Sequence, residues 1–486
     1  MSYSSVLLFV SALLAVMAYG ASAYAAELAP DGMLEVDGRR MFVLGLYENP
    51  ADDAVLERVA AAGFNLVHAT EDHGALDRLH ERGLFAWVNT GYRIDLSPAH
   101  REERRGQLAE LAGRFASHPA LLVWEVPDEA LWNVWYGAQT WGLGRGPEQQ
   151  RKLIGELEDE ALAEKLRGMM KEAHDHFERA EFKAWEEVSG AVWAALGQEN
   201  PNPGLTISDA PERASQLAAG MLEGYGALKE LDPAHPIWMN HAPRNSIEQL
   251  GEFNRAADIV GCDIYPVPVG GTGHSDLRER SLAAVGAYTV RMQDAARPAD
   301  GGPGKPAWMV LQGFGWSDLR ENPTEEDREK SPRPTFDQSR FMAYDAIARG
   351  ARGILYWGTA YIEKDSTLWE DLLRLVRELA DIEHVLSAPD ADMPITVDVA
   401  ESWGSRDREV VVLAKDVATG PEADRGLWLL VVNEGTEPLR FTIKGLGAAE
   451  GLVLEDGRAE RRAEVKGGSL DLAIRSGGIQ VLRPVR

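Results

Sequence analysis

The sequence predicts an α/β fold: a closed (β/α)8 TIM barrel with a helical insertion after its fourth strand, followed by a C-terminal antiparallel β-sandwich. Between about residues 36 and 390, eight short apolar runs alternate with amphipathic helical stretches. Runs that are apolar throughout are typical of parallel strands covered by helices, and eight such strand–helix units close a barrel. From residue 394 to residue 486 the helical periodicity fades, and strand-like runs alternate with turns rich in Gly and Asp.

The first 25 residues are expected to form a signal peptide. Residues 6–18 are almost continuously apolar, and Ala23-Tyr24-Ala25 is a small-x-small cleavage site. No Lys or Arg precedes Arg39, so the basic residues that usually begin a signal peptide are missing, and a retained membrane anchor is the alternative. The sequence therefore predicts a secreted or periplasmic protein, without stable membrane insertion after signal cleavage.

The composition is that of an ordinary globular protein with a strong acidic balance. The chain of 486 residues is 45% hydrophobic and 26% charged, and its net charge is −27. That balance argues against nucleic acid or an anionic membrane surface as a partner, since both require basic patches. Cys262 is the only cysteine, so no disulfide can form within the chain, and its apolar neighbours predict a buried small side chain. Nothing in the sequence indicates an oligomeric state.

The eight expected strands are residues 42–46, 64–67, 84–88, 121–126, 236–240, 258–263, 307–312 and 353–357. Apolar residues at helical spacing predict barrel helices at residues 52–62, 74–82, 102–117, 215–231 and 369–386. A doubly wound open sheet is the main alternative, but it usually carries a Gly-rich phosphate turn after its first strand. Here Tyr47-Glu48-Asn49-Pro50 follows that strand, which favours the barrel.

Two segments lie outside the strand–helix repeat. Residues 132–209 are too many for a simple connection, and their charge-rich centre, 149–196, predicts two helices in an inserted subdomain on the active-site face. The alternative for this insertion is a solvated flap with no part in chemistry. In the C-terminal region, residues 410–413, 427–432 and 439–443 are expected strands of the sandwich.

The fourth strand ends in the most informative stretch of the chain, Trp124-Glu125-Val126-Pro127-Asp128-Glu129. Pro127 cannot donate to a ladder, so the strand stops there. In a parallel barrel the C-terminal strand ends build the active site, which makes Glu129 the leading catalytic acid, with Asp128 beside it. The structural alternative is a helix start, because Asp and Glu are favoured in a first helical turn.

The other strand ends deliver carboxyls, amides and aromatic rings to the same face. The expected substrate-binding residues are Tyr47, Glu48, His68, Asn89, Arg93, Trp132, Trp135, Asn240, His241, Arg244, Tyr265, Gln312, Trp316 and Trp357, with Asp263 and Glu363 as further catalytic carboxyls. Sugar C–H faces stack on aromatic rings, and sugar hydroxyls pair with such polar groups, so the set suits a carbohydrate. Core packing is the alternative for any single Trp.

A metal site and a serine nucleophile were weighed as alternatives to this carbohydrate site. His68, Glu71, Asp72 and His73 cluster in the sequence, which leaves a metal-dependent hydrolase open, but they lack the His-Glu-x-x-His spacing of a zinc helix. The sequence has no Gly-x-Ser-x-Gly elbow and no phosphate loop. No metal or other cofactor is therefore expected.

Three features carry a family resemblance: the eight-strand barrel, the ending of the fourth strand and the segment Asp263-Ile264-Tyr265-Pro266. In these features the sequence resembles glycoside hydrolase clan A, the (β/α)8 retaining glycosidases that include β-galactosidases and cellulase-like enzymes. The resemblance covers roughly residues 36–390, and a C-terminal β-sandwich is a common companion. Clan members carry Asn-Glu at the end of strand four, where the Glu is the acid/base, and a nucleophilic Glu at the end of strand seven. The resemblance implies that Glu129 is the acid/base, that Asp128 replaces the Asn, and that Tyr265 lies near the nucleophile.

Strand seven departs from the clan pattern, because Gln312 stands where the nucleophilic Glu would be. Gln cannot form a glycosyl ester, so an inverting or relocated-base mechanism is preferred. The carboxyls best placed by strand position are Asp263 and Glu363, followed by Glu48 and Asp72. A substrate-assisted mechanism is the second choice, in which a 2-acetamido group attacks the anomeric carbon and Asp128 orients that group.

The sequence therefore predicts a glycoside hydrolase acting on an oligo- or polysaccharide, with an atypical or inverting mechanism. The alternative is a carbohydrate-binding protein without catalysis, built on a degenerate glycosidase barrel. Sugar, linkage and endo or exo action are not indicated.

Overall fold

The computed structural model describes residues 26–243, 245–270, 280–298, 304–400, 410–458 and 461–485. The expected signal peptide, residues 1–25, and the expected substrate-binding residue Arg244 lie outside the described residues. Within the described chain, no helix is both long enough and apolar enough to cross a membrane.

Eight parallel strands form a closed barrel, as the sequence predicted. They are β4 (Val43–Leu46), β5 (Leu66–Ala69), β6 (Phe85–Asn89), β7 (Leu121–Glu125), β8 (Ile237–His241), β9 (Ile259–Ile264), β10 (Ala307–Gln312) and β11 (Gly353–Trp357). Neighbours in the chain are neighbours in the barrel, and β11 closes on β4. Cys262 is buried in β9, as expected.

The barrel helices are α2 (Asp53–Ala62), α3 (His73–His80), α4 (Arg101–Phe115), α9 (Ala210–Leu231), α10 (Ile247–Asn254), α11 (Ala284–Ala295), α13 (Phe336–Ala348) and α14 (Thr367–Asp381), with short α12 (Glu325–Lys330) and α15 (Glu383–Leu386) beside them. The expected helix at 369–386 is divided at Ile382, whose φ of −112° and ψ of 20° leave the helical region. Side-chain caps at Asp52, Asp72 and Ser366 begin three of these helices.

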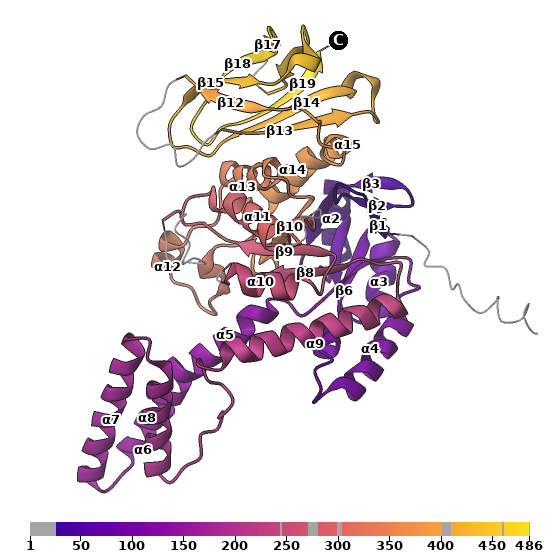
Figure 1. Cartoon of the computed structure of the whole chain (residues 1–486). Helices are drawn as coiled ribbons and strands as arrows, with labels where there is room; N and C mark the ends of the chain where they lie inside the picture. The colour runs from indigo at the N-terminus through magenta and orange to yellow at the C-terminus, as the bar shows by residue number, and fades with distance from the viewer. Residues whose placement is uncertain are drawn as a thin grey trace, which may run out of the picture.

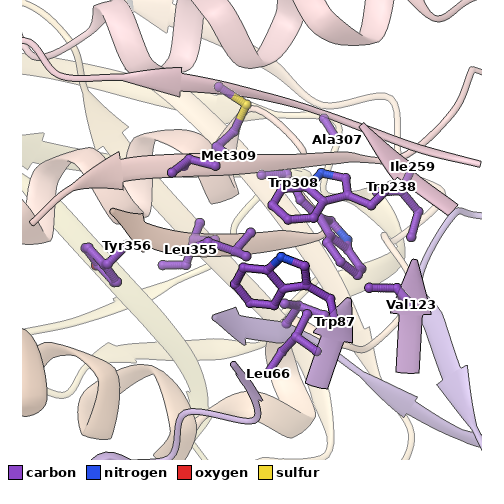
Figure 2. Packing of buried hydrophobic residues seen from close by; sticks show 14 of the residues in the cluster. Leu66, Trp87, Val123, Trp238, Ile259, Ala307, Trp308, Met309, Leu355 and Tyr356 are labelled. Carbon is purple, nitrogen blue, oxygen red and sulfur yellow. The ribbon is translucent and has the colours of Figure 1, made fainter. Parts of the chain in front are cut away.

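Tryptophan rings fill the barrel interior (Figure 2). Trp87 of β6, Trp238 of β8 and Trp308 of β10 come from alternate strands. The ring centroid of Trp238 lies 5.6 Å from that of Trp87 and 5.7 Å from that of Trp308. Neighbouring glycines make the room: a Cβ on Gly261 would lie 2.9 Å from Trp238, and one on Gly353 would lie 2.9 Å from Trp308. The interior is therefore a packed core, and the site must lie above it.

The insertion after β7 is a helical arm that projects away from the barrel (Figure 1). It runs through α5 (Ala130–Gln139), a π-helix (Thr140–Arg145), α6 (Gly146–Gly155), α7 (Glu160–Glu178) and α8 (Phe182–Ala195), and returns through α9. The prediction of two helices in residues 149–196 is wrong, because three helices occupy this part of the arm. Helix α6 ends at Gly155, and the Asp159 side chain caps the start of α7.

Two sheets form the C-terminal sandwich. One contains β12 (Thr396–Val399), β15 (Leu439–Lys444) and β18 (Ser469–Ile474), and the other contains β13 (Val410–Val417), β14 (Gly426–Asn433), β19 (Ile479–Val485), β16 (Val453–Asp456) and β17 (Arg461–Glu464). In β14, Leu429 and Val431 pack in the sandwich core, while Leu430 and Val432 pack against the barrel cluster. The sandwich is thus attached to the barrel by a strand buried on both faces.

A small antiparallel sheet near the N-terminus was not predicted. It consists of β1 (Ala26–Leu28), β2 (Leu34–Val36) and β3 (Arg39–Met41). Arg40 ties it to the end of α15, because its Nε donates to the carbonyl of Ser387 at 2.6 Å.

Candidate active site

A cavity of about 180 Å³ lies at the C-terminal ends of the barrel strands. Its lining residues are Tyr47, Asp128, Glu129, Asn240, Asp263, Tyr265, Trp316, Leu319 and Trp357. All of them except Leu319 were expected at the site from the sequence. They lie at or just after the C-terminal ends of β4, β7, β8, β9, β10 and β11, so strand ends distant in sequence meet at one place.

Glu129 occupies a strained backbone position between β7 and α5. Its φ is 50° and its ψ is 34°, a left-handed conformation that costs a non-Gly residue roughly 1–3 kcal/mol. The backbone N–H of Glu129 donates to the carbonyl of Asn240 at 3.2 Å, which holds the turn against β8. Strain of this kind persists where the surrounding structure imposes it, and it gathers at functional sites.

Glu129 and Asp263 form a hydrogen-bonded carboxyl pair in the lining of the cavity. Burial raises the pKa of Asp263 to about 8, the negative charge of Asp128 adds to this rise, and a side-chain hydrogen bond with Glu129 acts in the opposite direction. Because its pKa is raised to about 8, the Asp263 carboxyl is mostly protonated at neutral pH, and its hydrogen bond joins it to Glu129.

Asp128 and Asn240 extend the polar cluster on the other side of Glu129. The Nδ2 of Asn240 donates to Oδ1 of Asp128 at 2.9 Å and also bonds Asp263. Burial within the barrel mouth raises the pKa of Asp128, against the effect of the Asn240 bond. Asp128 is nevertheless exposed to water through the cavity, and solvent reduces that rise. Asn240 thus orients two carboxyls at once.

Glu125 is a buried acid that the sequence analysis did not select. Its side chain accepts hydrogen bonds from Trp87 Nε1 at 3.1 Å and Asn89 Nδ2 at 2.8 Å, and the Tyr47 hydroxyl lies 3.3 Å away. Burial and the charge of Asp128 raise the pKa of Glu125 to about 8. The signal available was the alternation of side chains along a strand, since Glu125 follows Val123 by two residues and therefore lies on the same face of β7.

Aromatic rings form a wall of the cavity. Tyr265 and Trp357 are stacked with ring centroids 5.6 Å apart and an interplanar angle of 16°. Trp316 meets Tyr265 edge-on at 6.2 Å. Rings above paired carboxyls are the arrangement expected for a sugar-binding site, because the rings contact C–H faces while the acids contact hydroxyls.

Gln312 and His241 are the last residues of β10 and β8, but they do not line the cavity. Gln312 is fully buried, and its Nε2 donates to the carbonyls of Val267 at 2.9 Å and Phe314 at 3.0 Å while its Oε1 accepts from the N–H of Val267. His241 is buried with its Nε2 2.8 Å from Oδ1 of Asn254, and burial lowers its pKa to about 4. Both side chains hold neighbouring backbone or helices in position.

Several other expected residues also lie outside the cavity lining, each with a structural partner. Glu363 is exposed, and its carboxylate lies 2.8 Å from the Arg333 guanidinium. A backbone hydrogen bond is the largest cause of the lowered pKa of Glu363, and Arg333 lowers it further. Glu48 accepts from Lys364 at 2.7 Å. The remaining pairs are Arg93 with Glu71, Asn89 with Glu125, His68 against Trp87, Trp132 against Tyr136, and Trp135 in the apolar core of the arm. Of the four expected carboxyls, Asp128, Glu129 and Asp263 come together, and Glu363 does not.

Among the described residues, no group of three or more His, Cys, Asp or Glu side chains is arranged to hold a metal ion. The cluster that the sequence suggested is dispersed: Glu71 pairs with Arg93, Asp72 caps α3, and His73 packs against Phe115.

No family model and no curated protein matches the chain. Among solved structures it is similar to a glycoside hydrolase (TM-score 0.52, 13% identity, 96% of this chain and 97% of that chain) and to a glycoside hydrolase family 5 protein from Bacteroides vulgatus ATCC 8482 (TM-score 0.51, 14% identity, 95% and 93%). The chain has the fold of these proteins. It also matches a β-galactosidase from Marinomonas ef1 at a TM-score of 0.43 and 16% identity, over 71% of this chain and 62% of that chain, less than two thirds of that enzyme.

Proposed function

We propose that the protein is a glycoside hydrolase whose active site is the cavity at the barrel mouth. The observation that carries the proposal is the hydrogen-bonded pair of Glu129 and Asp263 in the same cavity as the rings of Tyr265, Trp316 and Trp357. The shared barrel fold of the glycoside hydrolases above agrees with it. Because three carboxyls line the cavity, a neutral sugar suits it better than a uronic acid, whose carboxylate they would repel.

In this proposal Glu129 is the general acid. Asp263 is the nucleophile, because Gln312 stands where the nucleophilic Glu would be and cannot take that role. The Asp263 carboxylate bonds to the anomeric carbon while the glycosidic C–O bond breaks and Glu129 protonates the leaving oxygen. Water then hydrolyses the glycosyl ester, and the Glu129 carboxylate takes the proton of that water. Asp128 and Asn240 hold the pair in place and contact sugar hydroxyls.

The hydrogen bond between Glu129 and Asp263 is our argument for retention of configuration. Carboxyls of retaining enzymes lie roughly 5–5.5 Å apart and those of inverting enzymes roughly 6.5–9.5 Å apart. A hydrogen-bonded pair opens to the smaller separation with less movement when a sugar enters between its members. The inverting route preferred from the sequence therefore becomes the second choice, with Asp263 in either case the partner of Glu129.

The decisive experiment compares Glu129→Gln, Asp263→Asn and Glu363→Gln on a panel of neutral chromogenic glycosides. Glu129→Gln and Asp263→Asn should lower kcat/KM by at least about 1,000-fold, while Glu363→Gln, an exposed carboxyl outside the cavity, should leave it unchanged. Retention should be seen by NMR of the first product anomer. Full activity of Asp263→Asn on 2-acetamido sugars alone would favour the substrate-assisted route, and full activity of Glu129→Gln would remove the proposal.

The ionisation of Asp263 sets the expected pH dependence. Because the pKa of Asp263 is raised to about 8, the nucleophilic carboxylate becomes populated only as the pH approaches that value. The acidic limb of the kcat/KM profile should therefore lie near pH 8. A limb near pH 4 would mean that the working carboxylate is a different one.

A second candidate function is carbohydrate binding without hydrolysis, and Gln312 is the observation that favours it. A degenerate site would bind oligosaccharides with no product formed from any member of the panel. Measuring binding by calorimetry beside product release separates the two functions.

A further inference from the structure

The helical arm contains a second cavity, larger than the one at the barrel mouth. It has a volume of about 300 Å³ and opens between the π-helix, α6, α7 and α8, all within the arm. It shares no lining residue with the barrel cavity. Sites for small molecules occupy roughly 300–1,000 Å³ and combine apolar walls with a few polar groups, so the cavity lies at the lower end of that range.

The cavity interrupts the apolar core of the arm. That core is divided into two separate clusters, one containing Ala173 and Trp185 and the other containing Leu166 and Val192. Ala173, Trp185 and Val192 all line the cavity, so it lies between the two clusters. The cavity is partly open to solvent, so a ligand can enter it from the surface of the arm.

The backbone of the arm is shaped around the cavity. The segment Thr140–Arg145 is a π-helix, a rare conformation that appears frequently at functional sites. Gly142 of this segment lines the cavity, and a Cβ there would lie 2.1 Å from the ring of Trp185. The missing side chain of Gly142 leaves room for the edge of the Trp185 ring, which lines the cavity.

The rim of the cavity is basic although the chain is strongly acidic. Arg151, Arg167, Lys171 and His174 line it, and none of the described residues that line it is acidic. Arg167 is already paired with Glu160 and Glu164, and His174 lies 3.8 Å from Glu178, whereas Arg151 and Lys171 are exposed at the opening. In a protein of net charge −27, these two exposed cations beside an apolar wall are complementary to an anion.

We propose that this cavity binds a small organic anion with an aromatic body, whose ring lies against Trp185 and Phe177 and whose carboxylate, sulfonate or phosphate group meets Lys171 and Arg151. The arm is thereby a ligand-binding module, independent of hydrolysis at the barrel mouth. The site is separate from Glu129 and Asp263, so it stands or falls independently of the proposed glycosidase activity.

The test uses the full chain and two fluorescent probes, anilinonaphthalene sulfonate and its neutral counterpart phenylnaphthylamine. The sulfonate should bind saturably at one site, about fivefold more tightly than the neutral probe, since a charge pair near a surface is worth roughly 1 kcal/mol. Lys171→Glu should weaken sulfonate binding at least fivefold and leave the neutral probe unchanged. Lys165→Glu, the same charge reversal on an exposed part of α7 outside the cavity, is the matched control.

Three results would overturn the proposal. They are absence of saturable sulfonate binding, equal affinity for the two probes, and equal losses in Lys171→Glu and Lys165→Glu, which would show a general effect of net charge. Circular dichroism of both variants establishes that the helices of the arm are intact. A loss of sulfonate binding in Lys171→Glu alone then identifies the rim of this cavity as the binding site.

Discussion

The side-chain amide of Gln312 has the donors and acceptors that its position demands. Its NH2 group faces the carbonyls of Val267 and Phe314, and its oxygen faces the N–H of Val267. A carboxylate here would face two carbonyl oxygens in a fully buried place. The residue that departs from the glycosidase pattern is therefore required by the local hydrogen bonds, and restoring Glu would not restore a nucleophile.

The variant Gln312→Glu tests this reasoning. We expect no gain in glycoside turnover and a loss of about 2–4 kcal/mol in the free energy of unfolding at pH 7, the cost of a buried charge without a partner. The loss should shrink as the pH falls and the new carboxyl becomes protonated. Gln338→Glu is the matched control, because Gln338 accepts from the N–H of Thr335 in a capping box that a carboxylate also completes. Urea unfolding at pH 5 and pH 7 measures both, and a more active Gln312→Glu would contradict the interpretation.

Glu125 makes the stability of the protein depend on pH. Its pKa in the folded protein is raised to about 8, so the folded state binds the proton more tightly than the unfolded chain does. Its contribution is complete below its ordinary value of 4.5 and is lost as the pH rises through about 8. Protonated Glu125 offers the same shape and nearly the same hydrogen bonds as Gln, with Trp87 and Asn89 donating to one atom and Tyr47 facing the other.

The free energy of unfolding of Glu125→Gln should therefore be nearly that of the parent at pH 5 and about 2–4 kcal/mol larger at pH 9. Each unit of pKa difference between the folded and unfolded states corresponds to roughly 1.4 kcal/mol. Denaturant unfolding across this pH range measures the difference. Equal curves for parent and variant at pH 9 would mean that Glu125 is ionised in the native protein at lower pH.

At the scale of elements, strands buried on both faces were the predictable part of the fold. Each of the eight barrel strands overlaps its predicted run, because such strands carry almost only apolar residues. The sheet β1–β3 was missed, since strands of three residues with charged side chains such as Glu35 and Arg39 leave no periodic pattern. The arm's third helix was missed because its boundary, after Gly155, lies in a continuous charge-rich stretch.

The site was predictable in position along the strands but not in side-chain direction. Residues just after strand ends were selected, and Glu129, Asp263 and Tyr265 do line the cavity. Gln312 and His241 also end strands, but they are turned into hydrogen bonds that depend on loops and helices distant in sequence. Such tertiary partners are invisible in the local pattern, which is why strand position alone over-predicted the contacts.

The tryptophans of the barrel interior predict which glycines of the strands cannot be replaced. Gly353 of β11 has Val43 and Trp308 so close that an added Cβ would lie 2.8 and 2.9 Å from them. Gly353→Ala should lower the free energy of unfolding by about 1–3 kcal/mol, the usual cost of overpacking. Gly113→Ala, on an exposed part of α4 with nothing within 4 Å, should instead stabilise by about 0.5–1 kcal/mol through helix propensity. In thermal unfolding we expect Gly353→Ala to lower the melting temperature and Gly113→Ala to raise it. Equal changes in the two variants would contradict the packing of Trp308 against Gly353.

At the scale of the whole molecule, barrel and sandwich are joined by a proton-sharing group of side chains. Arg349, after α13, donates two hydrogen bonds to Glu434 of the sandwich at 2.7 and 2.5 Å. Asp345 of α13 is buried, and burial together with the Glu434 carboxylate raises its pKa well above its ordinary value. A raised pKa in the folded state contributes stability at low pH that is lost as the pH rises. The contact between the two domains should therefore weaken in alkali.

Arg349→Met should make this pH dependence steeper, because it leaves the Glu434 carboxylate beside Asp345 without its cation. We expect a loss of about 2–4 kcal/mol at pH 8, less than for a fully buried pair because Arg349 is 32% exposed, and a smaller loss at pH 5, where the raised pKa of Asp345 keeps that carboxyl protonated. Limited proteolysis and thermal unfolding at both pH values would measure it, with cleavage between barrel and sandwich appearing first at pH 8. Arg58→Met is the control, since its pair with Glu370 is exposed and worth at most about 1 kcal/mol. A loss in Arg349→Met that is equal at pH 5 and pH 8 would mean that the guanidinium contributes packing alone, and that the junction does not respond to protons.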